Sequence, residues 1–265
     1  MFTFTKSNSL RVMGVLGLLV ASTAHATVVE VRTALGNVQI NLFDEETPET
    51  VENFLEYVNS GAYANTVVHR LEPGFVAQSG GFVYNGMFPL DSVATGTPVT
   101  NEPTLSNVRG TIAMAKLASS PDSATSQWFI NLSDNSANLD VQNGGFTVFG
   151  QVLGNGMEVL DAIEDLPRFN LGGAADSIPL IDYTSADANN DVEVTGDNLV
   201  IITDVVVTDS ATVTNPDIVP VENTLIDAGT PDVPDSGNNS SGGGSVGFFL
   251  LSLALVCRCI KFKRT

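Results

Sequence analysis

The sequence predicts a mainly β fold, a closed barrel of eight antiparallel strands capped by two α-helices. Short runs rich in valine, isoleucine, threonine and aromatic residues recur along residues 27–208. Only two segments of this region place apolar residues at helical spacing. Closing such a sheet into a barrel removes exposed strand edges, and a β-sandwich is the alternative architecture.

Eight segments carry the strand pattern. In the second of them, Val38, Ile40 and Leu42 alternate with polar residues, which predicts one buried and one solvated face. The predicted strands are 27–33, 37–43, 65–71, 74–79, 110–116, 126–132, 146–152 and 198–208.

Local signals mark the two predicted helices. Thr47 is a suitable N-cap with Pro48 at the first helical position, and apolar residues at helical spacing follow until Gly61. A shorter amphipathic pattern covers 156–166 and ends at Pro167.

Charge and composition exclude several functional classes. The chain of 265 residues has 11 basic and 30 acidic side chains, and its net charge of −19 argues against a nucleic-acid partner. Both cysteines, Cys257 and Cys259, lie near the C-terminus, and His69 is the sole histidine of 27–208. This excludes disulfide frameworks, cysteine nucleophiles and multi-histidine zinc centres from that region, and we expect no cofactor.

The N-terminal segment 1–26 has the pattern of a cleaved export signal. Lys6 and Arg11 precede the apolar run 12–20, and the segment ends in Ala24-His25-Ala26, a small-x-small cleavage pattern. The apolar run is too short to span a bilayer. We therefore expect one exported domain over 27–208.

The C-terminal part divides into two predicted segments. An acidic linker rich in proline, aspartate, threonine and asparagine covers 209–240, and 241–265 combines glycines, a short hydrophobic helix and a basic end. This layout resembles the glycine-rich sorting tails of Gram-negative bacteria, which a rhomboid-type protease is thought to cut. A plain membrane anchor is the alternative, and both place the domain in the periplasm, the envelope or the cell surface.

A rare arginine marks the candidate site. Residues 69–80 read HRLEPGFVAQSG, and Arg70 is one of only five basic side chains between Glu30 and Asp235. On spacing alone, Arg70 could simply pair with a surface carboxylate. However, the pattern HR-x-x-x-GF-x-x-Q-x-G, followed by GTIAMA at 110–115, SQWFI at 126–130 and FTVFG at 146–150, resembles the cyclophilin-type peptidyl-prolyl isomerases.

The resemblance covers 29–207 and implies a role for specific residues. It makes Arg70 the catalytic arginine and implies a proline pocket and a set of contacts to the peptide backbone. Lys116 stands at the family's asparagine and Asn138 near the family's tryptophan, so both lie at the predicted substrate site. The implied pocket is Phe75, Val76, Phe129, Leu139 and Phe146, and the backbone contacts are Gln78, Ala115 and Gln127.

Strand parity supplies an independent check on these roles. Gln127 and Phe129 are two residues apart and share a face, whereas Trp128 points the other way into the core. His69 lies opposite Arg70 by the same argument, so we expect it to be structural.

The implied reaction suits the residues present. Rotation about an Xaa-Pro bond breaks no covalent bond and needs no acid, base or metal, and the predicted substrates are proline-containing polypeptide segments. The alternative function is a non-catalytic module that binds proline peptides, and we expect a monomer in either case. A weak calcium candidate, with alternating oxygen ligands, is Asp187, Asn189, Asp191 and Glu193; a solvated acidic loop is the alternative.

Overall fold

The computed structural model describes residues 27–210, 215 and 217–226. The predicted export signal 1–26 and the hydrophobic tail 241–265 lie outside these residues. Within the described part, no helix combines the length and the apolar character needed to cross a membrane.

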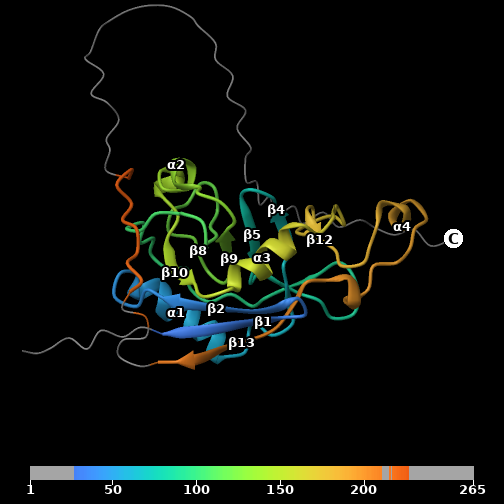
Figure 1. The fold of residues 1–265 in the computed structure, drawn as a ribbon, viewed down its shortest axis with the longest axis horizontal. Helices are drawn as coiled ribbons and strands as arrows, with labels where there is room; N and C mark the ends of the chain where they lie inside the picture. Colours follow the sequence, from blue (N-terminus) through green and yellow to red (C-terminus); the bar gives the residue numbers. More distant parts are fainter. Residues whose placement is uncertain (1–26, 211–214, 216, 227–265) are drawn as a thin grey trace, which may run out of the picture.

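A curled antiparallel sheet of eleven strands forms the body (Figure 1). The strand order is β4-β5-β9-β8-β10-β2-β1-β13-β3-β6-β7, and β11 pairs with β12 in a separate two-stranded sheet. The strands are β1 (Val28–Thr33), β2 (Gly36–Leu42), β3 (Thr66–Val67), β4 (Arg70–Glu72), β5 (Val76–Ser79), β6 (Phe82–Val83), β7 (Asp91–Ser92), β8 (Thr111–Met114), β9 (Trp128–Asn131), β10 (Val148–Val152), β11 (Arg168–Phe169), β12 (Ile178–Pro179) and β13 (Ile201–Asp209).

Each of the eight predicted strand segments contains strand structure, with one subdivision. The segment 65–71 divides into β3, which pairs with β13, and β4, which pairs with β5. Between them, the Val68 amide donates to the Val200 carbonyl at 3.0 Å and the His69 amide donates to the Gln78 carbonyl at 3.2 Å. The sequence pattern did not predict the two-residue strands β6, β7, β11 and β12.

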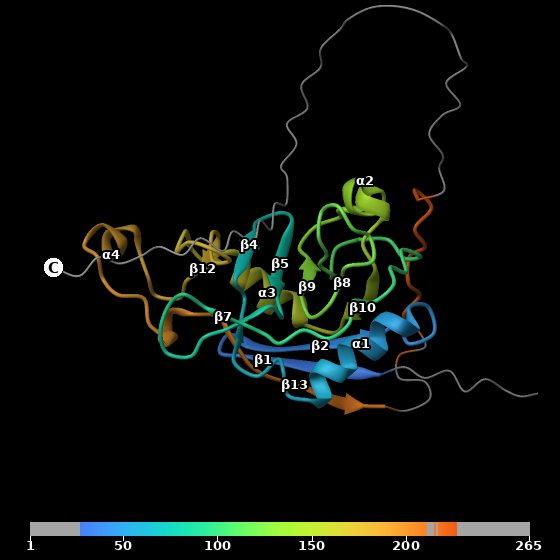
Figure 2. The ribbon, with the colours of Figure 1, turned by 180° about the vertical axis from the view of Figure 1, so that it is seen from behind.

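Both predicted helices are confirmed, and two shorter ones accompany them. Figures 1 and 2, drawn from opposite sides, show α1 and α3 on opposite sides of the curled sheet. The helices are α1 (Pro48–Asn59), α2 (Ser136–Leu139), α3 (Gly156–Glu164) and α4 (Ser185–Asn189), with 3-10 turns η1 (Gln142–Gly144) and η2 (Gly196–Asn198).

The start of α1 differs in detail from the prediction. Pro48 occupies the first turn as expected, but the Thr47 hydroxyl donates to the Phe43 carbonyl at 3.3 Å and does not cap the helix. The Glu102 carboxylate accepts from the Thr50 amide at 2.8 Å instead. An acidic group at this end also complements the helix dipole.

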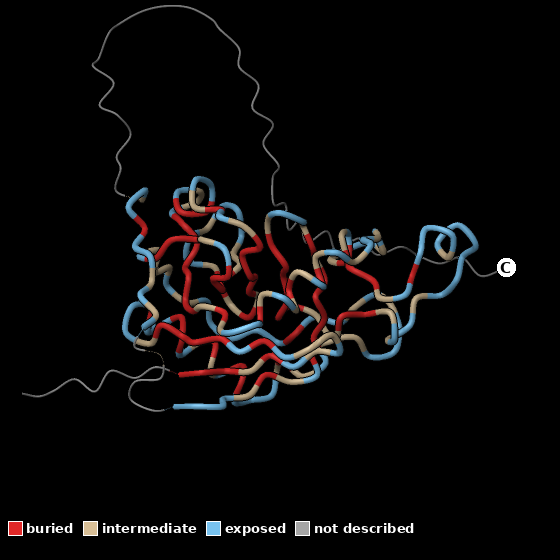
Figure 3. Tube along the Cα trace, viewed as in Figure 1, coloured by how far each residue is buried: buried red, intermediate tan, exposed pale blue. Residues whose placement is uncertain are grey.

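The central strands bury side chains on both faces. Leu71, Ala77 and Ile130 belong to the main core inside the curled sheet. Their sequence neighbours Val76 and Phe129 belong to a second buried apolar cluster on the other face. Figure 3 shows the buried segments running through the middle of the body, while the loop around α4 is largely exposed. The second cluster is where the predicted proline pocket lies.

Candidate active site

Strand register places three predicted site residues in one row. Arg70 on β4 is opposite Gln78 on β5, and Gln78 is opposite Phe129 on β9. Directly opposite residues of antiparallel strands project to the same face of the sheet. Arg70, Gln78 and Phe129 therefore share the face that turns away from the main core.

The predicted pocket residues come together on this face. The Phe129 and Phe146 rings pack edge to face, with centroids 5.8 Å apart and an interplanar angle of 70°. Phe75 and Ala115 are half-buried and pack against the cluster. The buried members, hereafter the pocket cluster, are Phe43, Val76, Leu105, Ala113, Phe129, Leu139, Phe146 and Val148.

Two glutamines add polar groups beside the pocket cluster. The Gln78 side-chain amide donates to the Gln127 side-chain carbonyl at 2.8 Å, which holds both side chains in one orientation. The Gln127 backbone carbonyl accepts from the Ala115 amide at 2.9 Å. The structure thus brings the three predicted peptide-contacting residues next to each other.

Arg70 is anchored loosely and keeps donors available. Its side chain is 21% exposed, and its Nη2 lies 3.5 Å from Glu72 Oε1. That distance exceeds a normal hydrogen bond, so the guanidinium can still donate to a ligand. Glu72 Oε2 also lies 3.3 Å from Arg168 Nη1, so two of the few arginines share one carboxylate. Sequence reasoning missed Glu72, although its position two residues after Arg70 on a strand was a usable signal.

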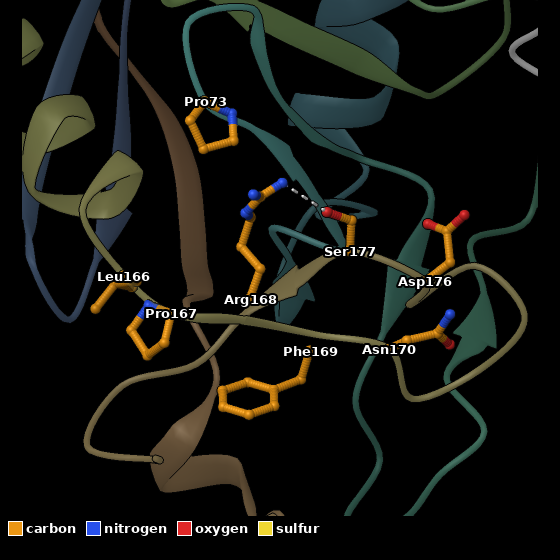
Figure 4. A pocket seen from close by; sticks show the side chains of 8 residues that line it. All are labelled: Pro73, Leu166, Pro167, Arg168, Phe169, Asn170, Asp176 and Ser177. Atoms are coloured by element: carbon orange, nitrogen blue, oxygen red, sulfur yellow. Dashed lines mark hydrogen bonds between the residues drawn. The ribbon is translucent and has the colours of Figure 1, made fainter. Parts of the chain in front are cut away.

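An open depression lies beside this ion-pair group (Figure 4). Arg168 projects into it, and its Nη1 lies 3.5 Å from the Ser177 hydroxyl. The depression contains no member of the pocket cluster; it is lined by Pro73, Leu166, Pro167, Arg168, Phe169, Asn170, Asp176 and Ser177.

Lys116 and Asn138 differ from the other predicted substrate contacts. The Lys116 ammonium donates to the Asn143 carbonyl at 2.9 Å and to the Gly145 carbonyl, and it lies 4.9 Å from the centroid of the Phe146 ring. Burial lowers the pKa of Lys116 to about 8, against the opposing charge of Asp122. Lys116 thus holds the loop before Phe146 in place through these carbonyls. Asn138 lies on α2, and its side chain is exposed.

His69 does not simply face away from the site as parity predicts, because β3 ends at Val67, β4 begins at Arg70, and the His69 side chain interacts with Gln127. It is buried, and its ring centroid is 4.8 Å from that of Phe82. Burial, together with the nearby Arg70 charge, lowers its pKa to about 4, against the opposing effect of hydrogen bonds with Val67 and Gln127. His69 is therefore neutral at pH 7 and structural.

Trp128 points away from the site, into the main core. It is 3% exposed and contacts Tyr63 edge to face, with ring centroids 6.4 Å apart. The alternation along β9 is confirmed.

A buried polar network supports the pocket from behind, and sequence reasoning missed it. The Asp140 carboxylate accepts from the Ser106 hydroxyl at 2.5 Å and from the Asn107 amide at 2.7 Å. The Asn107 side chain donates to the Phe146 carbonyl at 3.1 Å. Asp140 follows Leu139 directly, so the network holds two walls of the pocket.

The calcium candidate is not supported. The Asp187 carboxylate accepts from the Thr184 amide at 2.8 Å and from the Thr184 hydroxyl at 2.6 Å, which makes it the capping partner of α4. Within the described residues, no group of three or more acidic, histidine or cysteine side chains could hold a metal ion. Asn189, Asp191 and Glu193 are exposed, and Asp191 and Glu193 lie beyond the end of α4, which agrees with the alternative of a solvated acidic loop.

The family model of cyclophilin type peptidyl-prolyl cis-trans isomerases matches residues 28–183. The chain belongs to the cyclophilin family. The peptidyl-prolyl cis-trans isomerase of Acinetobacter baylyi is 44% identical over 160 residues, 59% of this chain and 82% of the relative. Peptidyl-prolyl cis-trans isomerase A of Dickeya dadantii is 45% identical over 169 residues, 61% and 85% of the two chains. Peptidyl-prolyl cis-trans isomerase B of Escherichia coli is 41% identical over 143 residues, which cover 52% of this chain and 84% of the relative. The matched range contains every residue of the cyclophilin site described above.

Proposed function

We propose that this chain catalyses cis-trans isomerisation of Xaa-Pro peptide bonds in proline-containing polypeptide segments. The observation that carries the proposal is a single loosely anchored arginine, Arg70, on the same sheet face as a buried apolar cluster. The relatives named as peptidyl-prolyl isomerases support the same activity.

The site geometry accounts for the chemistry. Rotation about the Xaa-Pro bond is opposed by amide resonance, with a barrier of ~18–20 kcal/mol. An acceleration of 10⁵-fold requires about 7 kcal/mol of preferential binding to the twisted amide. The proline ring packs against Phe129 and Phe146, while Gln78 and Gln127 hold the peptide backbone.

Arg70 supplies the preference for the twisted state. As resonance is lost, the prolyl nitrogen becomes pyramidal and gains a lone pair that can accept a hydrogen bond. The guanidinium donates to this nitrogen, and the planar substrate offers no equivalent acceptor. No proton transfer is required, which agrees with a buried, neutral His69.

The test is an isomerisation assay by NMR exchange, with the full chain and an Xaa-Pro peptide. We expect Arg70→Ala and Arg70→Lys to lower kcat/KM by about 100-fold or more, because lysine lacks the planar fork of donors. Arg168→Ala is the matched control, since Arg168 shares Glu72 with Arg70 but lies outside the pocket, and its kcat/KM should change by less than about threefold.

Two results would contradict this function. A folded Arg70→Ala variant as active as the parent excludes the arginine mechanism. If the folded parent binds proline peptides but does not accelerate isomerisation, the chain is instead the non-catalytic binding module given as the alternative function.

We also propose that the curled sheet closes into an eight-stranded barrel. Only Val68 and His69 separate β3 from β4. The Val68 amide donates to the carbonyl of Val200, which directly precedes β13, and the His69 amide donates to the carbonyl of Gln78 on β5. Treated as one strand, β3 and β4 link β13 to β5 and complete a ring with β9, β8, β10, β2 and β1.

The cellular context is a further part of the proposal. We propose an exported monomer in the periplasm, the envelope or the cell surface, held by the tail 241–265 unless a sorting protease removes it. The basic start, the apolar run 12–20 and the motif ending at Ala26 support export. Cell fractionation and N-terminal sequencing test it; a mature chain starting at Thr27 is expected, and a full-length cytoplasmic chain would contradict it.

A further inference from the structure

The described segment 217–226 lies well beyond β13 and packs against the body. We call it the C-terminal strap. It runs beside α2, coloured orange-red at the left of Figure 1 and at the right of Figure 2. The Ser106 amide donates to the Val221 carbonyl and the Asn223 amide donates to the Thr104 carbonyl, both at 2.8 Å. The strap therefore adds a short antiparallel pairing to the segment 104–106.

Asn223 is the central residue of this contact. It is 7% exposed. Its side-chain nitrogen donates to the Asp140 carbonyl at 2.9 Å and to the Pro103 carbonyl at 3.1 Å. Its side-chain oxygen accepts from the amides of Leu225 and Ile226, at 3.0 and 3.1 Å. A buried amide with all these bonds joins the strap to two segments of the body at once.

The two segments that Asn223 joins both support the proline pocket. Asp140 directly follows Leu139, a pocket wall, and the Leu139 carbonyl accepts from the Phe146 amide at 2.8 Å. The other segment leads from Pro103 into Leu105, which is itself in the pocket cluster.

Two apolar side chains of the strap extend the same support. Ile218 packs against the pocket cluster. Ile226 lies against Gly145: a Cβ added to Gly145 would lie 3.2 Å from Cδ1 of Ile226. Gly145 directly precedes Phe146, so the strap contacts the pocket loop from outside.

We propose that the C-terminal strap is a positioning element for the proline pocket and that Asn223 is its positioning residue. By fixing Asp140 and Pro103, Asn223 holds the walls formed by Leu139 and Phe146 at the spacing that a proline ring requires. This inference rests on the proposed isomerase function and assigns that site a support outside the matched range 28–183.

The test compares Asn223→Ala with Thr224→Ala in the full chain. Thr224 is the neighbouring strap residue and is exposed, so it is a matched control. A loosened pocket weakens binding of substrate and transition state alike, so we expect Asn223→Ala to raise KM by about three- to tenfold with kcat within about twofold of the parent. Hydrogen exchange of the Phe146 amide should accelerate, while amides in β1 and β2 should keep the parent's rates.

A second variant keeps the test decisive. Asn223→Ser retains a short polar group, so its KM and the hydrogen-exchange rate of its Phe146 amide should lie between those of the parent and Asn223→Ala. If the alanine variant does not fold, the serine variant provides the test. Parent-like KM and Phe146 exchange in folded Asn223 variants would overturn the proposal, even if Tm falls. An inactive parent would refute the isomerase function, while the exchange comparison would still decide the role of the strap.

Discussion

At the residue scale, neighbouring side chains take different roles because they are buried to different degrees. His69 and Arg70 are adjacent in the chain, yet one is buried without charge and the other stays at the site with free donors. A buried imidazole that resists protonation makes stability depend on pH.

We expect the unfolding free energy to fall as pH falls from 7 to 5. The unfolded chain binds a proton at His69 below its ordinary pKa of 6.5, whereas the folded chain does not until about 4. Acid therefore favours the unfolded state, by about 2 kcal/mol at pH 5 for one fully buried histidine. Denaturant melts of the parent and His69→Gln measure this; equal pH dependence in both proteins would contradict it.

Pocket side chains should affect binding more than turnover. Phe129→Ala removes an aromatic wall that is 4% exposed and in contact with Phe146. We expect a rise in KM of about tenfold or more, with the fold retained, because the ring contacts substrate in the ground state and the transition state alike. Steady-state isomerisation assays of the parent and the variant give KM and kcat, and the fluorescence of Trp128 reports whether each protein is folded. An unchanged KM would exclude Phe129 from the pocket.

At the element scale, the approach of β5 to β9 depends on a glycine. Gly80 follows β5 with φ of +78°, and an added Cβ would lie 2.5 Å from the Ser126 carbonyl oxygen and 2.7 Å from Trp128 Cδ1. Neither backbone nor a buried indole can yield at that distance. This close approach keeps Gln78 and Gln127 in contact.

Gly80→Ala should therefore destabilise the domain much more than Gly74→Ala. Gly74 also has a positive φ, +68°, but an added Cβ there meets nothing within 4 Å. We expect about 1 kcal/mol of backbone strain at Gly74 and about 3 kcal/mol or more at Gly80, where steric overlap is added. Thermal or urea melts of both variants measure the difference, and equal losses of stability would mean that strand packing adjusts freely.

At the scale of the whole molecule, charge separates the site from its surroundings. The chain carries a net charge of −19, and the site contains Arg70 with Arg168 and Lys116 nearby. An acidic surface concentrates cationic partners around the domain and repels polyanions.

Substrate charge should therefore influence the rate. We expect kcat/KM to be higher for a proline peptide flanked by lysines than for one flanked by glutamates at low salt. The ratio should approach one as salt rises, because the Debye length falls from about 30 Å at 0.01 M to about 3 Å at 1 M. A salt-independent ratio would show that only local contacts select the substrate.

Patterns within short stretches of sequence predicted much of this protein. The motif around Arg70 was found through its resemblance to the cyclophilin family. The eight strand segments, the helices α1 and α3 and the opposite faces of Phe129 and Trp128 depend on local periodicity and on residues such as Pro48 that start or end a helix. These features are set by backbone geometry over a few residues, so a single sequence carries them.

Only the tertiary structure decided how distant segments meet. It engages Lys116 with the carbonyls before Phe146, places Glu72 between Arg70 and Arg168, and brings Asn223 to Asp140. The pattern around Asn223 is that of an acidic linker, because proline, aspartate and threonine there indicate solvated chain. The contacts of Lys116 with Asn143, Glu72 with Arg168 and Asn223 with Asp140 join residues 27, 96 and 83 positions apart, and they depend on strand order and loop paths, which local periodicity does not encode.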